Sequence, residues 1–108
     1  MAKRDFTNIP LVNKKGEKGR FEIDIDGQIA FMEYMVSKQN IIYLTHTEVP
    51  PSLGGQGVGS ALVSKVLQFI KEKESDMKMA PLCPFVAAYI KRHPEAGEAI
   101  LAEGYSIG

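Results

Sequence analysis

The amino-acid sequence predicts a small α+β domain, with α/β mixing, built on a mainly antiparallel sheet with two to three helices. Apolar and polar residues alternate through the first half of the chain, which is the period of β-strands. From residue 57 onward apolar residues recur at helical spacing, interrupted by a short apolar run at 77–82. Three antiparallel strands, helix, strand and helix in this order are typical of a sheet with helices packed on it. The 108 residues suffice for one domain, 1–108, in which we expect 1–8 and 104–108 to be loose tails.

The composition argues against several classes of function. The formal net charge is zero, with 13 Lys and Arg against 13 Asp and Glu, so no basic excess indicates nucleic acid. No apolar run is long enough to span a bilayer, and the N-terminus leads into no signal-like segment. The single cysteine excludes an internal disulfide and, with two histidines, an ordinary structural zinc site. We therefore expect a cytoplasmic protein without metal, nucleic-acid or membrane partners, as a monomer or weak homodimer.

Two strands joined by a tight turn are expected near the N-terminus. Residues 20–26 alternate, and Asp26-Gly27 is a strong signal for a two-residue hairpin turn. Residues 28–36 are apolar on both faces, which predicts a strand inside the sheet. The residues of the first strand that we expect on one apolar face are Phe21, Ile23 and Ile25.

A third strand is predicted over residues 41–49. It ends at Pro50, because proline has no N–H to donate to a sheet ladder. Strict alternation divides its side chains between two faces. One face is expected to carry Ile42, Leu44, His46 and Glu48, and the other Ile41, Tyr43, Thr45, Thr47 and Val49.

The second half of the chain predicts helices around one more strand. A helix is expected over about 57–73, and a strand over 77–82 that lies beside the third strand. Proline is favoured at the first position of a helix, so Pro84 is expected to open a second helix that runs through Arg92. A last short helix is expected over 95–103. The residues of the second helix expected to face inward are Phe85, Val86, Tyr89 and Ile90.

A glycine-dense stretch joins the third strand to the first helix. Four glycines lie within the six positions 54–59, which permits a tight turn and leaves no Cβ to block a ligand. The helix that follows begins with unpaired N–H groups and a partial positive charge. Strand, turn and helix in this order favour an anion cradle, for which phosphate is the usual ligand. A glycine-rich loop with no ligand is the alternative.

The glycine spacing matches neither of two common phosphate loops. A Walker A loop needs a lysine after its last glycine, where this chain has Ser60, and the dinucleotide pattern Gly-x-Gly-x-x-Gly is one residue longer. The run Val49-x-Pro51-x-x-Gly54-Gly55-x-Gly57-x-Gly59-Ser60 resembles the acetyl-coenzyme A loop of the GNAT (GCN5-related N-acetyltransferase) superfamily. The resemblance implies that backbone N–H groups from about Gly55 to Ser60 hold the pyrophosphate of coenzyme A. Gly54 stands where that family usually has Arg or Gln, so we expect weaker affinity or a more mobile loop. The cofactor-binding residues that the resemblance implies are Val49, Gly54, Gly55, Gln56, Gly57, Val58, Gly59 and Ser60, with Pro84 and Phe85 in the next helix.

A second stretch surrounds Cys83. Its place before Pro84 puts the thiol near a helix N-cap, where the positive end of the helix favours thiolate. A small buried apolar residue is an equal alternative. The run from Pro81 through Pro94 closely resembles one in a group of short stand-alone GNAT-like acetyltransferases, as does His46-Thr47-Glu48-Val49. The resemblance implies that Cys83 lies near the acetyl thioester in a catalytic role, and that Tyr89 can protonate the leaving thiolate.

His46 is the third candidate catalytic residue. Imidazole titrates near neutral pH, so His46 could act as general base for an amine, and a histidine that only forms hydrogen bonds at a strand end is the alternative. We therefore expect an N-acetyltransferase that moves acetyl from acetyl-coenzyme A to a small-molecule or peptide amine. The amine attacks either directly, with His46 as base, or after acetylation of Cys83. A module that binds coenzyme A or acyl-coenzyme A without turnover is the second hypothesis, and an interaction domain without cofactor is the third.

Overall fold

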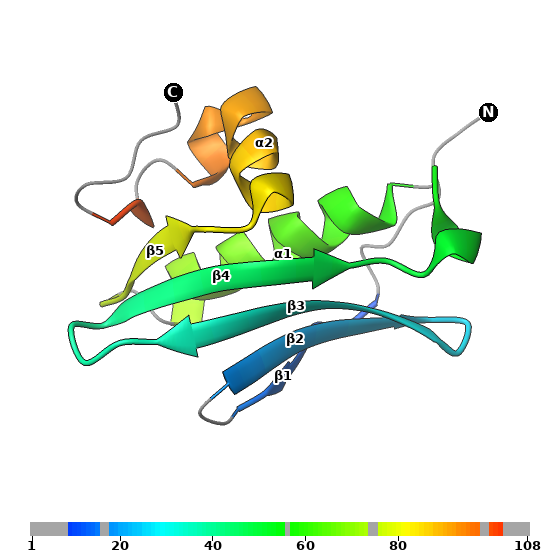
Figure 1. Ribbon diagram of the computed structural model, residues 1–108, viewed down its shortest axis with the longest axis horizontal. Coiled ribbons are helices and arrows are strands. Elements are labelled where there is room, and N and C mark those ends of the chain that lie inside the picture. Colours follow the sequence, from blue (N-terminus) through cyan, green and yellow to red (C-terminus); the bar gives the residue numbers. More distant parts are fainter. Residues whose placement is uncertain (1–8, 16–17, 56, 74–75, 98–99, 103–108) are drawn as a thin grey trace.

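The computed structural model describes residues 9–15, 18–55, 57–73, 76–97 and 100–102 of the chain, and a five-stranded sheet forms its centre (Figure 1). The elements are β1 (Val12–Lys14), β2 (Lys18–Ile25), β3 (Gln28–Val36), β4 (Ile41–Glu48), α1 (Val58–Lys73), β5 (Lys78–Pro81) and α2 (Pro84–Arg92), with 3₁₀ turns η1 (Pro51–Leu53) and η2 (Pro94–Ala96). The strand order is β1-β2-β3-β4-β5. Strands β1 to β4 are antiparallel, and β5 is parallel to β4. The predicted α+β class with a mainly antiparallel sheet is confirmed.

The β2–β3 hairpin forms where the sequence predicts it. Ile25 pairs with Gln28 across a two-residue loop. Both loop residues have positive φ, 55° at Asp26 and 87° at Gly27, which is the pattern of the hairpin turns that match strand twist. The Gly27 N–H also donates to Asp24 Oδ1 at 2.8 Å. Strand β3 lies between β2 and β4, as its two apolar faces predict.

The hydrophobic core lies between one face of the sheet and α1. Helix α1 crosses behind the strands in Figure 1 and contacts β2 and β3. Apolar residues at helical spacing in α1 are fully buried, because they form the stripe that meets the sheet. The sheet side of the core includes Phe21, Ile23 and Ile25 as predicted, together with Ala30, Met32, Ile42 and Leu44. We call the other side of the sheet, turned away from α1, the outer face.

A β-bulge interrupts β4. Glu33 pairs with His46, but the next residue of β3, Tyr34, pairs with Leu44, so Thr45 is an extra residue in β4. The Thr45 hydroxyl donates to the Glu33 carbonyl at 3.2 Å, which occupies the acceptor opposite the bulge. The strict alternation predicted for this strand is therefore wrong beyond Leu44, because the extra residue reverses which side chains face the core.

The C-terminal segment differs from the predicted helix over 95–103. Its described part is the short turn η2 followed by a strand-like contact, in which Leu101 forms a parallel bridge with Met79. The Ala102 N–H donates to the Met79 carbonyl at 2.8 Å, so this backbone is paired with β5 rather than within a helix. Gly97 lies so close to Ile90 that an added Cβ would be 2.9 Å from its Cδ1, so a larger residue there would displace the Ile90 side chain. The predicted tails 1–8 and 104–108 lie outside the described residues.

Helix α2 has the predicted bounds. Val86 and Ile90 are buried as expected. Phe85 is 40% exposed, so its predicted inward orientation is wrong. Among the described residues, no helix combines the length and the hydropathy that crossing a bilayer requires.

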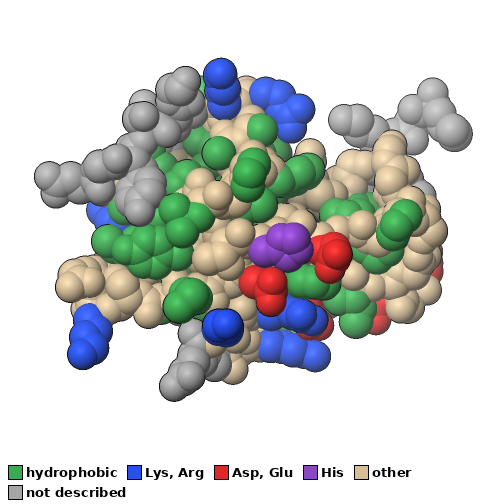
Figure 2. Space-filling model, viewed as in Figure 1, with side chains coloured by type: hydrophobic (Ala, Val, Ile, Leu, Met, Phe, Trp, Pro, Cys, Tyr) green, Lys and Arg blue, Asp and Glu red, His purple; other side chains and the backbone are tan. Residues whose placement is uncertain are grey.

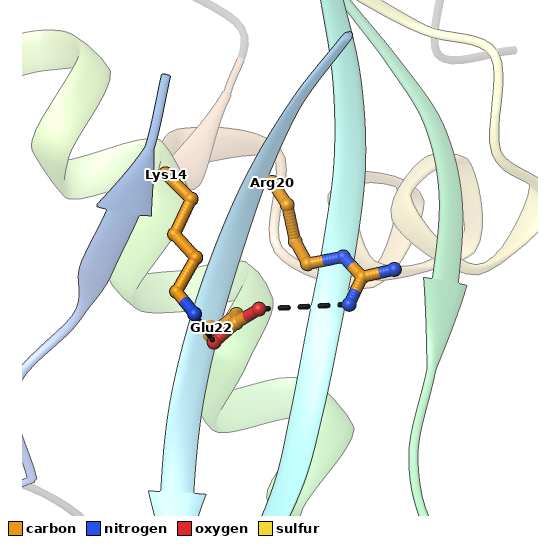
Figure 3. A network of polar contacts seen from close by, with 3 residues as sticks. All are labelled: Lys14, Arg20 and Glu22. Carbon is orange, nitrogen blue, oxygen red and sulfur yellow. Dashed lines mark ion pairs between the residues drawn. The ribbon is translucent and has the colours of Figure 1, made fainter. Parts of the chain in front are cut away.

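An ion-pair cluster lies on the outer face near β1 and β2 (Figure 3). The Glu22 carboxylate, with a side chain only 9% exposed, lies 3.4 Å from Lys14 Nζ and 3.6 Å from an Arg20 guanidinium nitrogen. The Arg20 guanidinium also lies 3.9 Å from the centre of the Phe31 ring, where the ring's π face attracts a cation. These contacts explain why Glu22 can be buried although it carries a charge.

Candidate functional site

Strands β4 and β5 diverge at the candidate site. Their parallel pairing runs from Ile41 with Lys78 to Leu44 with Pro81. The last link is the Cys83 N–H, which donates to the Leu44 carbonyl at 2.8 Å. Beyond it β4 continues to Glu48 without a partner in β5, and the two chain segments separate in Figure 1. β4 and β5 therefore splay apart beyond Leu44 and Pro81.

Cys83 lies at the start of α2, beside the end of β4 that has no partner in β5. It is the N-cap residue, with φ −71° and ψ 126°, and Pro84 follows at the first helical position. Its side chain is 5% exposed. The predicted N-cap position and the alternative of a small buried residue are both realised. The thiol donates to Thr47 Oγ1 at 3.3 Å, so the residue facing Cys83 comes from β4.

The bulge at Thr45 decides which residue of β4 faces the thiol. Thr47 pairs with the buried Met32 and therefore lies on the core side of the sheet. His46 pairs with Glu33 and lies on the outer face. Without the extra residue the alternation would have turned His46 to the core side, so the structure does not bring His46 and Cys83 to the same face.

His46 belongs to a polar cluster on the outer face. Its ring centre lies 6.3 Å from that of Phe31, and its cross-strand neighbour is Glu33. Figure 2 shows this side of the molecule, with a histidine between acidic side chains and with Lys and Arg beside them. His46 is exposed and open to solvent. It could meet a cationic amine that approached the end of β4 from the outer face.

Tyr89 lies farther along α2 than the thiol. Six residues separate it from Cys83, which corresponds to about 9 Å along a helix axis. The ring is half-buried, and its centre lies 4.8 Å from that of His93. The described contacts therefore place the Tyr89 ring toward the C-terminal end of α2.

The glycine loop is anchored at one end and turned by two left-handed glycines. Leu53, at the end of η1, is buried in the core with 3% exposure, and half-buried Val49 packs against that core. The Gly54 N–H donates to the Pro51 carbonyl at 3.0 Å, so this amide is already used by the chain. Gly55 and Gly57 have φ of 78° and 83°, a region that residues with a Cβ adopt at a cost. Gln56, another predicted ligand, lies outside the described residues.

The start of α1 supplies the amides that follow the loop. Among the described residues the first backbone hydrogen bond of this turn runs from the Ala61 N–H to the Gly57 carbonyl, at 3.0 Å. The preceding amides are those that a helix start leaves without an intrahelical acceptor. They belong to Val58, Gly59 and Ser60, of which Val58 anchors its side chain in the core with 1% exposure.

One contact joins the loop to the thiol segment. A Cβ added at Gly59 would lie 2.5 Å from Cζ of Phe85, so the Phe85 ring packs against the backbone of α1's first turn. Because Phe85 follows Cys83 by two residues, this contact brings the beginnings of α1 and α2 together. Pro84, between them, is exposed.

The comparisons with known proteins agree with this arrangement. A family model described as GCN5-related N-acetyl-transferase matches residues 20–100, which is most of the chain. The chain belongs to the GCN5-related N-acetyltransferase family. Among curated proteins, mouse Protein NATD1 is similar, at 29% identity over 80 residues, covering 72% of this chain and 71% of the relative. Human Protein NATD1 is 32% identical over 69 residues, covering 64% of this chain and 58% of the relative.

Membership of the GCN5-related N-acetyltransferase family confirms the resemblance drawn from the two motifs and supports an acetyltransferase-type function in general. Thr47, whose hydroxyl accepts a hydrogen bond from the Cys83 thiol, is not among the site residues predicted from the sequence. It lies in the run His46-Thr47-Glu48-Val49, which predicts a strand and carries part of the family resemblance but indicates no contact with Cys83. Strict alternation along this strand predicts Thr47 on the face opposite Ile42 and Leu44. The bulge that changes its face cannot be recognised from the alternation of the side chains.

Proposed function

We propose that the protein transfers the acetyl group of acetyl-coenzyme A to an amine. The observation that carries the proposal is the packing of Phe85 on Gly59, which holds the only thiol of the chain beside a helix start that follows a glycine loop. Acetyl-coenzyme A has a pyrophosphate at one end and a thioester at the other. An anion cradle and a thiol on neighbouring helix starts suit these two ends.

The fit of the pyrophosphate rests on the chemistry of the donors. The amides of Val58, Gly59 and Ser60 have no intrahelical acceptor, and the partial positive charge of a helix start favours an anion there. Gly55 and Gly57 turn the loop through positive φ angles and have no side chains of their own to block an anion. We assign four of the remaining predicted ligands, Val49, Gly54, Pro84 and Phe85, to the walls of the same site. The fifth, Gln56, lies outside the described residues. Gly54 contributes through its position, because its amide is donated to Pro51.

The covalent route uses Cys83. Its sulfur forms a bond to the acetyl carbonyl carbon while the bond from that carbon to the coenzyme A sulfur breaks, and the thiol proton goes to the departing sulfur. The amine nitrogen then attacks acetyl-Cys83. A nitrogen–carbon bond forms, the carbon–sulfur bond breaks, and a proton from the amine returns the thiol.

The direct route uses His46 as general base. His46 would accept a proton from an ammonium or attacking amine on the outer face, while the thioester is held on the core side. Tyr89 is proposed as the acid that protonates the leaving coenzyme A thiolate in this route. The acceptor is a small-molecule or peptide amine.

Thermal shift and mass spectrometry test the proposal together. Acetyl-coenzyme A and coenzyme A are expected to raise the melting temperature, and ATP and NAD to raise it less, because neither carries the pantetheine arm. Intact mass after incubation with acetyl-coenzyme A should show one added acetyl group, which Cys83→Ala abolishes. Transfer to a panel of amines is followed by release of free coenzyme A.

The outcomes separate the routes and the alternatives. Transfer by Cys83→Ala at the wild-type rate would exclude the covalent route and leave direct attack. Stabilisation by coenzyme A without transfer to any amine would identify a binding module without turnover. No stabilisation by either form of coenzyme A would overturn the proposal.

A further inference from the structure

Thr47 is the side chain that meets the thiol of Cys83, and the mechanism above gives it no role. The two residues are 36 positions apart in the sequence, and their side chains lie 3.3 Å apart from Oγ1 to Sγ. Cys83 is buried and Thr47 is half-buried, so the contact is shielded from water on the thiol side. A hydrogen bond in such surroundings competes less with solvent than one at the surface.

The backbone around this pair is built to bring the two side chains together. The bulge at Thr45 turns Thr47 to the core side of β4, where the regular period would have placed His46. The Cys83 N–H is held by the Leu44 carbonyl at 2.8 Å, which fixes the thiol residue against the same strand. Both partners are therefore positioned by main-chain hydrogen bonds on either side of the splay.

We infer that Thr47 is a positioning residue for Cys83, holding the sulfur in place in both of its protonation states. A hydroxyl has one donor and two acceptor positions. It accepts from the S–H group of the thiol, as the described geometry shows, and after rotation about its C–O bond it donates to the thiolate. A charge-assisted bond to the thiolate is the stronger of the two, so the hydroxyl favours the reactive form. The inference rests on the proposed use of Cys83 as acetyl acceptor.

The test compares Thr47→Val, which keeps the shape and removes the hydroxyl, with Thr47→Ser, which keeps the hydroxyl. Because the chain has a single cysteine, the ultraviolet absorbance of the thiolate against pH reports Cys83 alone once the Cys83→Ala spectrum is subtracted. We expect the midpoint of that curve to move up by about one pH unit in Thr47→Val, since a hydrogen bond to a charged group is at stake. Alkylation by iodoacetamide at neutral pH should slow about tenfold. Thr47→Ser should keep both values near wild type.

The readouts distinguish this inference from the proposed function. Acetyl-coenzyme A binding is expected to be unchanged in Thr47→Val, because the cradle residues are not altered. An unchanged midpoint in Thr47→Val, with circular dichroism showing a folded protein, would overturn the positioning role even if acetyl transfer persists. The positioning role would also be overturned if the titration midpoint and the alkylation rate changed as much in Thr47→Ser as in Thr47→Val. If Thr47→Val does not fold, Thr47→Ala replaces it as the variant without the hydroxyl, and its titration midpoint and alkylation rate are compared with those of Thr47→Ser.

A shifted midpoint in a protein that never becomes acetylated would support the pairing and contradict the proposed function alone. The acetylation rate measured by intact mass completes the comparison. If the hydroxyl acts through the thiol, the rate and the titration midpoint change together across the Thr47 variants.

Discussion

The ring of Phe85 rests on the backbone of Gly59, so that a Cβ at position 59 would lie 2.5 Å from the ring's Cζ atom. Phe85 is 40% exposed and does not belong to the buried core. The contact couples the first turn of α1 to the first turn of α2. We therefore expect a substitution in the first turn of one helix to alter the packing of the first turn of the other.

A double-mutant cycle tests that coupling. Gly59→Ala is expected to lower the free energy of unfolding by about 1 kcal/mol, because the Phe85 ring must move to admit the methyl group. In the Phe85→Ala background the same substitution should be neutral or stabilising, since alanine is the better helix former. Urea denaturation of the four proteins measures the difference. Additive effects would show that the ring and the glycine do not constrain each other.

The glycine loop offers a second test with a matched control. Gly55 and Gly27 have φ of 78° and 87°, and a Cβ on either would meet no atom within 4 Å. Gly55→Ala and Gly27→Ala should therefore cost a similar free energy of unfolding, about 1 kcal/mol from left-handed strain. Only Gly55→Ala is expected to weaken coenzyme A binding, by about tenfold, because its strain shifts the loop amides. Isothermal titration calorimetry measures both affinities, and equal affinities would argue against the cradle.

His46 and His93 allow the direct route and the covalent route to be separated. His46→Asn is expected to leave acetylation of Cys83 by acetyl-coenzyme A unchanged, because the imidazole lies on the other face of β4. Transfer to the amine should fall about 100-fold if the direct route operates with His46 as base, and should be retained if transfer runs through acetyl-Cys83. His93→Asn, at the exposed end of α2, is the control and should retain both rates. A loss confined to Cys83 acetylation would show that His46 acts on the core side after all.

The buried carboxylate of Glu22 is expected to stabilise the outer face. Glu22→Gln keeps the volume and removes the attraction to Lys14 and Arg20, so the free energy of unfolding should fall by about 1–2 kcal/mol. The exposed Glu48→Gln on the same face serves as control and should change stability by less than about 0.5 kcal/mol. Denaturation at low and high salt checks the cause. The difference between wild type and Glu22→Gln should shrink as salt screens the ion pairs.

Much of the fold could be predicted because local signals and packing agree. The Asp26-Gly27 turn, the bounds of β3 and the bounds of α2 follow from turn chemistry, apolar pattern and proline placement. The predicted helix over 95–103 was wrong in its described part, since pairing with Met79 in β5 takes the backbone that a helix would use. The local pattern of apolar residues does not show whether a segment will form a helix or pair with a distant strand.

The candidate site was predicted only in part, for a related reason. The loop and Cys83 were found from short motifs that carry their own backbone requirements. The partner of the thiol was not found, because the bulge at Thr45 is a property of the pairing between β3 and β4. This one extra residue exchanges the faces on which His46 and Thr47 lie. The order of apolar and polar side chains in the sequence does not indicate the bulge. The contact of Phe85 with Gly59 likewise depends on α1, a different part of the chain.

The parallel bridge between Met79 and Leu101 has a consequence for self-association. It occupies hydrogen-bonding groups on the far side of β5, where another polypeptide could otherwise extend the sheet. The opposite border, formed by the three residues of β1, is short and carries Lys14 beside the exposed Val12. The segment around Leu101 thus hinders the addition of a strand from another molecule beside β5. At the opposite border, the short length of β1 and the charge of Lys14 have the same effect.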